Sequence, residues 1–188
     1  MCTWQKAFGP ETWSNWALVV VGVGAIVTAL ITLLAIRDQT KALVESQRPK
    51  IAAKAHGNPT HDLADLQAPR VQIELFNRGP SVAQNLIYES WIELLPLPFK
   101  DFTAGADYHK SEDPVALYPS HVPLIINIPI RKGITEQQLS SLGRLETFAC
   151  VRVRVSYGDA FSAARAASFG FWVSSDGLGF LPKYNDAE

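Results

Sequence analysis

One uncharged segment near the N-terminus constrains this chain more than any other feature. No charged residue lies between Thr12 and Ile36, and the 21 residues from Trp16 to Ile36 read WALVVVGVGAIVTALITLLAI. As an α-helix this segment would be about 31 Å long, which matches the hydrocarbon core of a bilayer. It is longer than the apolar region of a signal peptide, and no small-residue cleavage site follows it. We therefore predict a retained transmembrane helix over residues 13–36.

The sequence on either side of this helix divides into four further parts. Residues 1–12 are a short N-terminal segment, and good helix formers after the span predict a helical extension over residues 37–49. Pro49 should end that helix, because the residue before a proline avoids the α conformation. We expect a folded domain over residues 50–173 and a C-terminal tail over residues 174–188.

The distribution of basic residues predicts how the span is oriented. Lys6 alone precedes the span, whereas five basic residues follow it: Arg37, Lys41, Arg48, Lys50 and Lys54. The positive-inside rule places the N-terminus outside and the C-terminal domain in the cytoplasm of a single-pass membrane protein. We expect Trp13 and Trp16 at one membrane interface and Arg37 and Lys41 at the other.

Small residues form a stripe along one side of the predicted span. They recur at helical spacing: Gly24, Ala25, Thr28, Ala29 and Thr32. Small residues four apart let a second helix approach closely, which predicts packing against another integral membrane subunit. The alternative is that such residues are simply common in membrane spans.

Beyond residue 50 the hydrophobic period changes from helical to two, which is typical of half-buried β-strands. The strand-like segments lie near residues 50–55, 71–75, 86–94, 122–130, 150–155 and 167–173. No helical pattern of ten or more residues separates them, and the only short candidate is Thr135–Leu142. This order disfavours parallel βαβ units and predicts a mainly β fold, an antiparallel β-sandwich behind the transmembrane α-helix.

Three short motifs follow the span in a fixed order: Gln47-Arg48-Pro49, Leu75-Phe76-Asn77-Arg78-Gly79-Pro80-Ser81-Val82-Ala83 and Tyr157-Gly158-Asp159-Ala160-Phe161. Over residues 13–173 the chain resembles a group of uncharacterised bacterial single-pass membrane proteins with an immunoglobulin-like domain. The spacing of Asn77, Gly79 and Ala83 is also similar to that of CARDB-type sandwiches. The chain departs from the group at Ser162, where a glycine is usual. The resemblance implies an immunoglobulin-like fold and a place in a bacterial inner membrane, and it brings no active site with it.

Aromatic residues outside the strand patterns predict a surface for partner docking. They lie in the irregular stretch Leu95–His121 and in the tail: Phe99, Phe102, Tyr108, Tyr118, Phe180 and Tyr184. Irregular segments of this length are often functional, and aromatic side chains are enriched at interfaces. The alternative is that these residues cover an edge of their own sheet.

The sequence contains no motif that names a reaction. Four residues of one polar loop could converge on a metal, but their spacing matches no recognised ligand pattern: His56, His61, Asp62 and Asp65. The net charge of −1 argues against a general nucleic-acid binder. Cys2 and Cys150 lie on opposite sides of the predicted span, so the two thiols are not expected to pair.

These observations lead to three hypotheses for function. We expect a non-catalytic accessory or scaffold subunit of a multi-subunit membrane complex, by analogy with one-span subunits of energy-transducing or photosynthetic assemblies. Its partners would be the lipid bilayer and other integral membrane subunits, with no cofactor, nucleic acid or small-molecule substrate. The alternatives are a membrane-tethered sensor module that binds a ligand or peptide, and a metal-dependent hydrolase.

Overall fold

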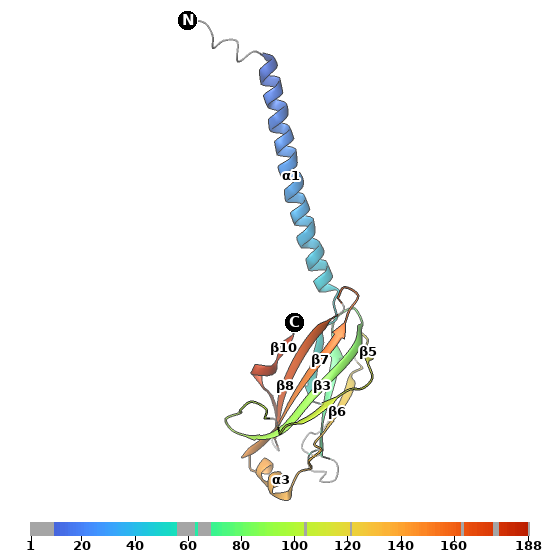
Figure 1. The fold of residues 1–188 in the computed structure, drawn as a ribbon, viewed down its shortest axis with the longest axis vertical. Coiled ribbons are helices and arrows are strands. Elements are labelled where there is room, and N and C mark those ends of the chain that lie inside the picture. The colour runs from blue at the N-terminus through green and yellow to red at the C-terminus, as the bar shows by residue number, and fades with distance from the viewer. Residues whose placement is uncertain are drawn as a thin grey trace. The chain divides into compact units, whose positions relative to one another are not determined.

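The computed structural model describes residues 10–55, 63, 69–103, 105–120, 122–162, 164–174 and 177–187. The chain divides into two compact units, Met1–Ser46 and Gln47–Glu188, which we describe separately. In the first unit one helix, α1 (Pro10–Ser46), contains the whole predicted span and most of the predicted extension (Figure 1). It ends three residues earlier than expected, because the Arg48–Lys50 backbone is already part of the second unit.

Among the described residues, α1 is the one helix long and apolar enough to cross a membrane. All its side chains from Trp16 to Ile36 are exposed within the chain, including every large apolar one. The hydroxyl groups of Thr28 and Thr32 each donate to the carbonyl oxygen four residues earlier, at 2.8 Å. The polar groups of these side chains are thus satisfied inside the helix, as an apolar environment requires.

The second unit consists mainly of two antiparallel sheets. The smaller sheet has the order β1-β2-β6, formed by Ile51–Ala55, Arg70–Asn77 and Leu124–Pro129. The larger sheet has the order β10-β8-β7-β3-β4, with β5 also paired to β3 and β9 to β8. Its strands are β3 (Ala83–Pro96), β4 (Asp107–Lys110), β5 (Val115–Leu117), β7 (Thr147–Gly158), β8 (Arg165–Ser174), β9 (Gly177–Phe180) and β10 (Asp186–Ala187). Every pairing between these strands is antiparallel.

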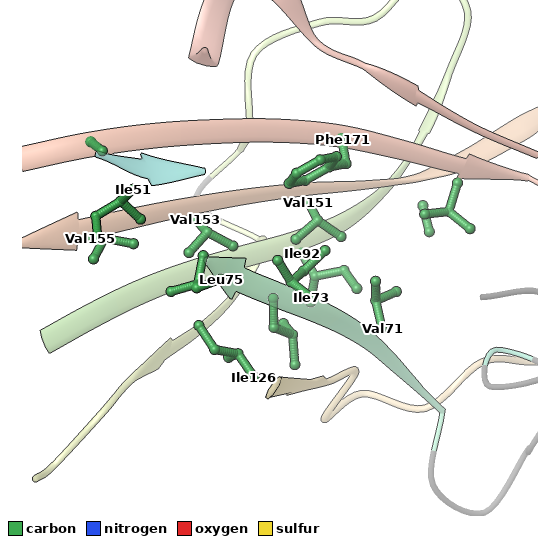
Figure 2. Packing of buried hydrophobic residues seen from close by; sticks show 14 of the residues in the cluster. Ile51, Val71, Ile73, Leu75, Ile92, Ile126, Val151, Val153, Val155 and Phe171 are labelled. Atoms are coloured by element: carbon green, nitrogen blue, oxygen red, sulfur yellow. The ribbon is translucent and has the colours of Figure 1, made fainter. Parts of the chain in front are cut away.

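Side chains from both sheets fill one hydrophobic core between them. Figure 2 shows residues of β2 facing residues of β3, β7 and β8 across this core. The largest fully buried side chains are Val71, Ile73, Leu75, Leu86, Ile92, Ile126, Ile128, Val151, Val153, Val155, Phe171 and Val173. These are the inward positions of the period-two pattern, and each full burial contributes about 1.5–3 kcal/mol. The predicted mainly β, antiparallel architecture is therefore confirmed.

Short elements account for most differences between the expected and the observed secondary structure. The stretch Leu95–His121 is not wholly irregular, since β4 and β5 lie within it, and the tail contains β9, a 3-10 turn η1 (Pro182–Tyr184) and β10. Strands of two to four residues are too short to show a period, so pairing with the sheet defines them. The short helix predicted near Thr135–Leu142 is present as α3 (Glu136–Gly143), which begins with a Thr135–Gln138 capping box.

Candidate functional site

The outer face of the larger sheet carries an unusual concentration of aromatic side chains. A second apolar cluster forms there, separate from the core between the sheets; we call it the outer aromatic cluster. Its buried members are Leu95, Phe148, Cys150 and Leu181, and its partly buried members are Phe99, Phe102, Trp172 and Tyr184. The loop after β3 and the C-terminal tail supply half of these residues, so two segments far apart in sequence meet on this face.

The rings of the outer aromatic cluster contact one another in favourable geometries. Phe99 packs edge-on against Phe148 with ring centroids 5.4 Å apart, and Phe148 meets Trp172 in the same way at 5.5 Å. Phe102 of the loop packs edge-on against Tyr184 of the tail at 5.5 Å. Such pairs contribute about 0.5–1.5 kcal/mol beyond their burial, so the loop and the tail stabilise each other.

Gly170 of β8 is the position at which the tail packs most closely on the sheet. A Cβ atom at this position would lie 2.8 Å from Cβ of Tyr184 and 3.0 Å from Cβ of Leu181, so only glycine admits the tail here. The Leu181 N–H donates to the Gly170 carbonyl at 2.9 Å. The Asn185 amide accepts from the Gly170 N–H and donates to its carbonyl, both at 3.2 Å. The Asn185 side chain thus partners the Gly170 N–H, and it shares the Gly170 carbonyl with the backbone N–H of Leu181.

A charged contact closes the junction between loop and tail. Asp101 forms an ion pair with Lys183 and accepts a hydrogen bond from the Tyr184 hydroxyl at 2.9 Å. The hydrogen bond from Lys183 is the main cause that lowers the pKa of Asp101. Burial and the bond to Asp101 raise the pKa of Tyr184, so at neutral pH the hydroxyl stays protonated and donates.

A hollow of about 480 Å³ lies between the loop and the tail. Its lining is mainly apolar, with Cys150 and Leu95 joined by Phe99, Phe102 and Tyr184, and charged residues occur at Lys100, Asp101 and Lys183. Burial raises the pKa of the Cys150 thiol to about 12. Since the thiolate is the reactive form, this cysteine acts as a small apolar group and not as a nucleophile. The hollow has the size and chemistry of a binding site.

Arg152 of β7 lies on the same outer face between two aromatic rings. Its guanidinium carbon is 5.2 Å from the centroid of Trp91 and 4.9 Å from that of Tyr184. Tyr108 packs on the Trp91 ring at 5.3 Å. Its position on the polar side of the β7 alternation is typical of a solvated residue, but the side chain is half-buried and stacked. The alternation of β7 shows which way it points, and only the tertiary structure shows that the tail covers it.

The six predicted docking residues fall into two groups. Phe99, Phe102 and Tyr184 pack on their own sheet in the outer aromatic cluster, on its outer face and not over an edge as the alternative expected. Tyr108 (44% exposed), Phe180 (59%) and Tyr118 (64%) offer more surface to a partner. The structure does not bring all six together, and docking remains a prediction.

The three motifs noted in the sequence meet at one end of the β-domain. The buried carboxylate of Asp159 lies between the guanidinium groups of Arg48 and Arg165, at 3.8 and 3.7 Å. The Asn77 side chain accepts from the N–H groups of Lys50 (3.2 Å) and Gly79 (3.0 Å). These residues connect the start of the domain to two of its turns, so the motifs have a structural role.

The remaining predicted residues are exposed on α1 or lie outside the described part of the chain. Gly24, Ala25, Thr28, Ala29 and Thr32 are exposed on α1, as are Trp13, Trp16, Arg37 and Lys41. His56, His61, Asp62 and Asp65 lie outside the described residues. Within the described ranges no group of three or more histidine, cysteine or acidic side chains could hold a metal ion.

Comparisons of this chain with protein-family models, with curated proteins and with solved structures find no match. The function therefore has to be argued from α1 and from the geometry of the β-domain.

Proposed function

We propose that the protein is a non-catalytic accessory subunit of a membrane complex, anchored by α1 in a bacterial inner membrane. The observation that carries this proposal is the uniformly exposed apolar surface of α1 from Trp16 to Ile36. In water that surface would be strongly unfavourable, whereas lipid or neighbouring helices would cover it. Basic residues after the span favour a cytoplasmic β-domain and an external N-terminus.

We further propose that the β-domain is an immunoglobulin-like sandwich. The sheet order β1-β2-β6 corresponds to strands A-B-E of that fold, and β8-β7-β3-β4 corresponds to G-F-C-C′. The fold alone does not define a function, but domains of this kind often serve as binding modules. This agrees with an accessory role in which α1 packs on other subunits and the domain presents a docking face.

The stripe on α1 offers a sharp test, because the helix contains two glycines on opposite sides. Gly22 and Gly24 are two residues apart, or 200° around the helix axis, and a Cβ at either meets nothing within 4 Å. Gly24→Leu blocks the small-residue stripe, and Gly22→Leu adds the same bulk to the opposite side. The variants would be purified in mild detergent and their co-purifying membrane proteins quantified by mass spectrometry.

Accessory function predicts that Gly24→Leu loses co-purifying subunits that the wild type and Gly22→Leu retain. A wild-type protein that purifies alone, or equal recovery with both variants, counts against the proposal. Orientation has its own test, in which protease is added to intact spheroplasts. Digestion of the β-domain there would refute a cytoplasmic location.

A second candidate function is a membrane-tethered sensor that binds a small ligand or peptide. The observation that favours it is the apolar hollow of about 480 Å³ in the outer aromatic cluster. Leu181→Trp should fill that hollow and abolish any ligand-induced rise in the melting temperature of the full-length protein. A ligand that stabilises the wild type and the variant equally would place binding elsewhere.

A further inference from the structure

A second, polar hollow lies on the larger sheet where β7 and β8 approach their connecting loop. It measures about 380 Å³, which is within the range of small-molecule sites. Asn85 of β3, Arg154 and Ser156 of β7 and Arg165 of β8 contribute to its lining. Arg154 and Ser156 are two residues apart on one strand, so their side chains share the outer face.

An irregularity in β3 gives the hollow one of its polar groups. The pairing of β3 with β7 shifts register between Gln84 and Ile87, and Asn85 within that step has a φ of 50°. Asparagine tolerates this left-handed conformation better than most residues. Such irregularities re-aim side chains and are common beside functional sites. Here the bulge leaves the exposed amide of Asn85 at the hollow.

Three hydrogen-bond donors at the hollow have no partner in the described part of the chain. These are the Arg154 guanidinium, the Asn85 amide and the Ser156 hydroxyl, none of which takes part in a hydrogen bond or ion pair there. Arg165 adds a second guanidinium, which is held at Asp159. The lining therefore offers positive charge and donors.

The carboxylate directly opposite Arg154 in the sheet has other partners. Glu89 is directly opposite Arg154 in the β3–β7 register, yet its carboxylate pairs with Lys110 at 3.5 Å and accepts from the Tyr108 hydroxyl at 3.2 Å. The carboxylate of Asp159 lies between the guanidinium groups of Arg48 and Arg165, at 3.8 and 3.7 Å. Arg152, two residues before Arg154, stacks on aromatic rings and adds further positive potential.

We propose that this hollow binds a phosphate or diphosphate group. A planar guanidinium presents paired N–H groups that match phosphate oxygens, and charge-assisted hydrogen bonds of this kind are stronger than neutral ones. The Asn85 amide and the Ser156 hydroxyl supply further donors to the remaining oxygens. Both a soluble phosphorylated metabolite and a phospholipid headgroup carry this chemistry. The site is separate from the apolar hollow, and the proposal does not depend on an accessory function.

Calorimetric titration of the full-length protein in dodecyl maltoside micelles with sodium pyrophosphate tests the site. We expect saturable binding by the wild type and a loss of about tenfold or more in affinity for Arg154→Ala, because a charge-assisted contact is removed. Arg154→Lys should fall between the two, since it keeps the charge but loses the paired donors. Asn85→Gly should weaken binding without disturbing a backbone at positive φ. Arg144→Ala removes an exposed arginine outside the hollow and should leave the affinity unchanged.

The source of the phosphate is distinguished by competition. Pyrophosphate binding is measured in the presence of vesicles of phosphatidylcholine alone and of vesicles of equal parts phosphatidylcholine and phosphatidylglycerol. The control variant is Arg144→Ala, which loses the same charge as Arg154→Ala. Loss of pyrophosphate binding only in the anionic vesicles identifies a lipid headgroup, and retained binding identifies a soluble ligand.

Two results would overturn the proposal. One is the absence of saturable pyrophosphate binding by the wild type, and the other is equal affinity of Arg154→Ala and Arg144→Ala. If a glutamate-rich peptide bound in an Arg154-dependent manner while pyrophosphate did not, the surface would recognise an acidic protein segment and the phosphate assignment would be wrong.

Discussion

Gly79 lies so close to the start of the β-domain that replacing it with alanine should destabilise the fold. An added Cβ would lie 2.6 Å from the backbone nitrogen of Lys50 and 2.7 Å from Cα of Pro49, and closer still to the carbonyl oxygen of Arg48. Cβ atoms essentially never approach other heavy atoms within 3.0 Å. Because the neighbours are backbone atoms, no side chain can rotate away, and the turn has to move.

The cost of this movement can be worked out from the contacts that it disturbs. Forcing an extra methyl group into a packed site costs about 1–3 kcal/mol. Displacing the turn also strains the bond from the Arg78 N–H to the Lys50 carbonyl (2.8 Å) and the bond from the Gly79 N–H to the Asn77 side chain (3.0 Å). With about 0.5–1.5 kcal/mol for each of the two hydrogen bonds, the free energy of unfolding should fall by about 2–6 kcal/mol. The melting temperature should then fall by roughly 5–20 °C.

Urea unfolding of the full-length protein in micelles, followed by near-ultraviolet circular dichroism, measures this loss. Gly143→Ala is the matched control, because a Cβ there meets nothing within 4 Å and the residue ends α3. Alanine suits a helix better than glycine by about 0.5–1 kcal/mol, so the control should unfold at an equal or higher urea concentration. If both variants unfolded at the same urea concentration as the wild type, the steric reasoning would be refuted.

Two further predictions concern the outer aromatic cluster. Burial raises the pKa of the Cys150 thiol to about 12, so little reactive thiolate is present at pH 8. In the Cys2→Ala variant, Cys150 should therefore resist maleimide in the folded state and react after unfolding in urea. Fast labelling of the folded protein would show instead that the thiol is accessible. Lys183 lowers the pKa of Asp101 below its ordinary value of 3.8, so the contribution of this pair to tail docking is present above that value and is lost as the pH falls through the lowered pKa. Asp101→Asn should speed amide hydrogen exchange in residues 177–187 at neutral pH. The factor should be small, because the ion pair is exposed to solvent. Unchanged exchange would show that the pair does not hold the tail.

Local patterns in the sequence were sufficient to predict the helix and the core strands. The uncharged run predicted α1 because an apolar segment of that length spans a bilayer, where a helix satisfies all its backbone hydrogen bonds within the segment. The alternation around Val71–Leu75 and Val151–Val155 predicted the inward positions, because the side-chain period of a strand is a local property. The N-terminal boundary of α3 was predictable for the same reason, since its capping residue is adjacent in the chain.

The candidate sites depended on contacts between distant segments, which periodicity does not encode. Phe102 and Tyr184 are both visible as aromatic residues outside strands, yet nothing local indicates that they pack against each other on one sheet. The alternation of β7 places Arg154 on the polar side of the strand, but only the folded structure shows that Glu89 opposite it contacts Lys110 and Tyr108. An apolar helix and strands with one buried face could therefore be predicted, because both arise from short-range regularity. The side chains that share a hollow could not be predicted, because they come from distant parts of the chain that meet only when loops and tail pack on the sheet.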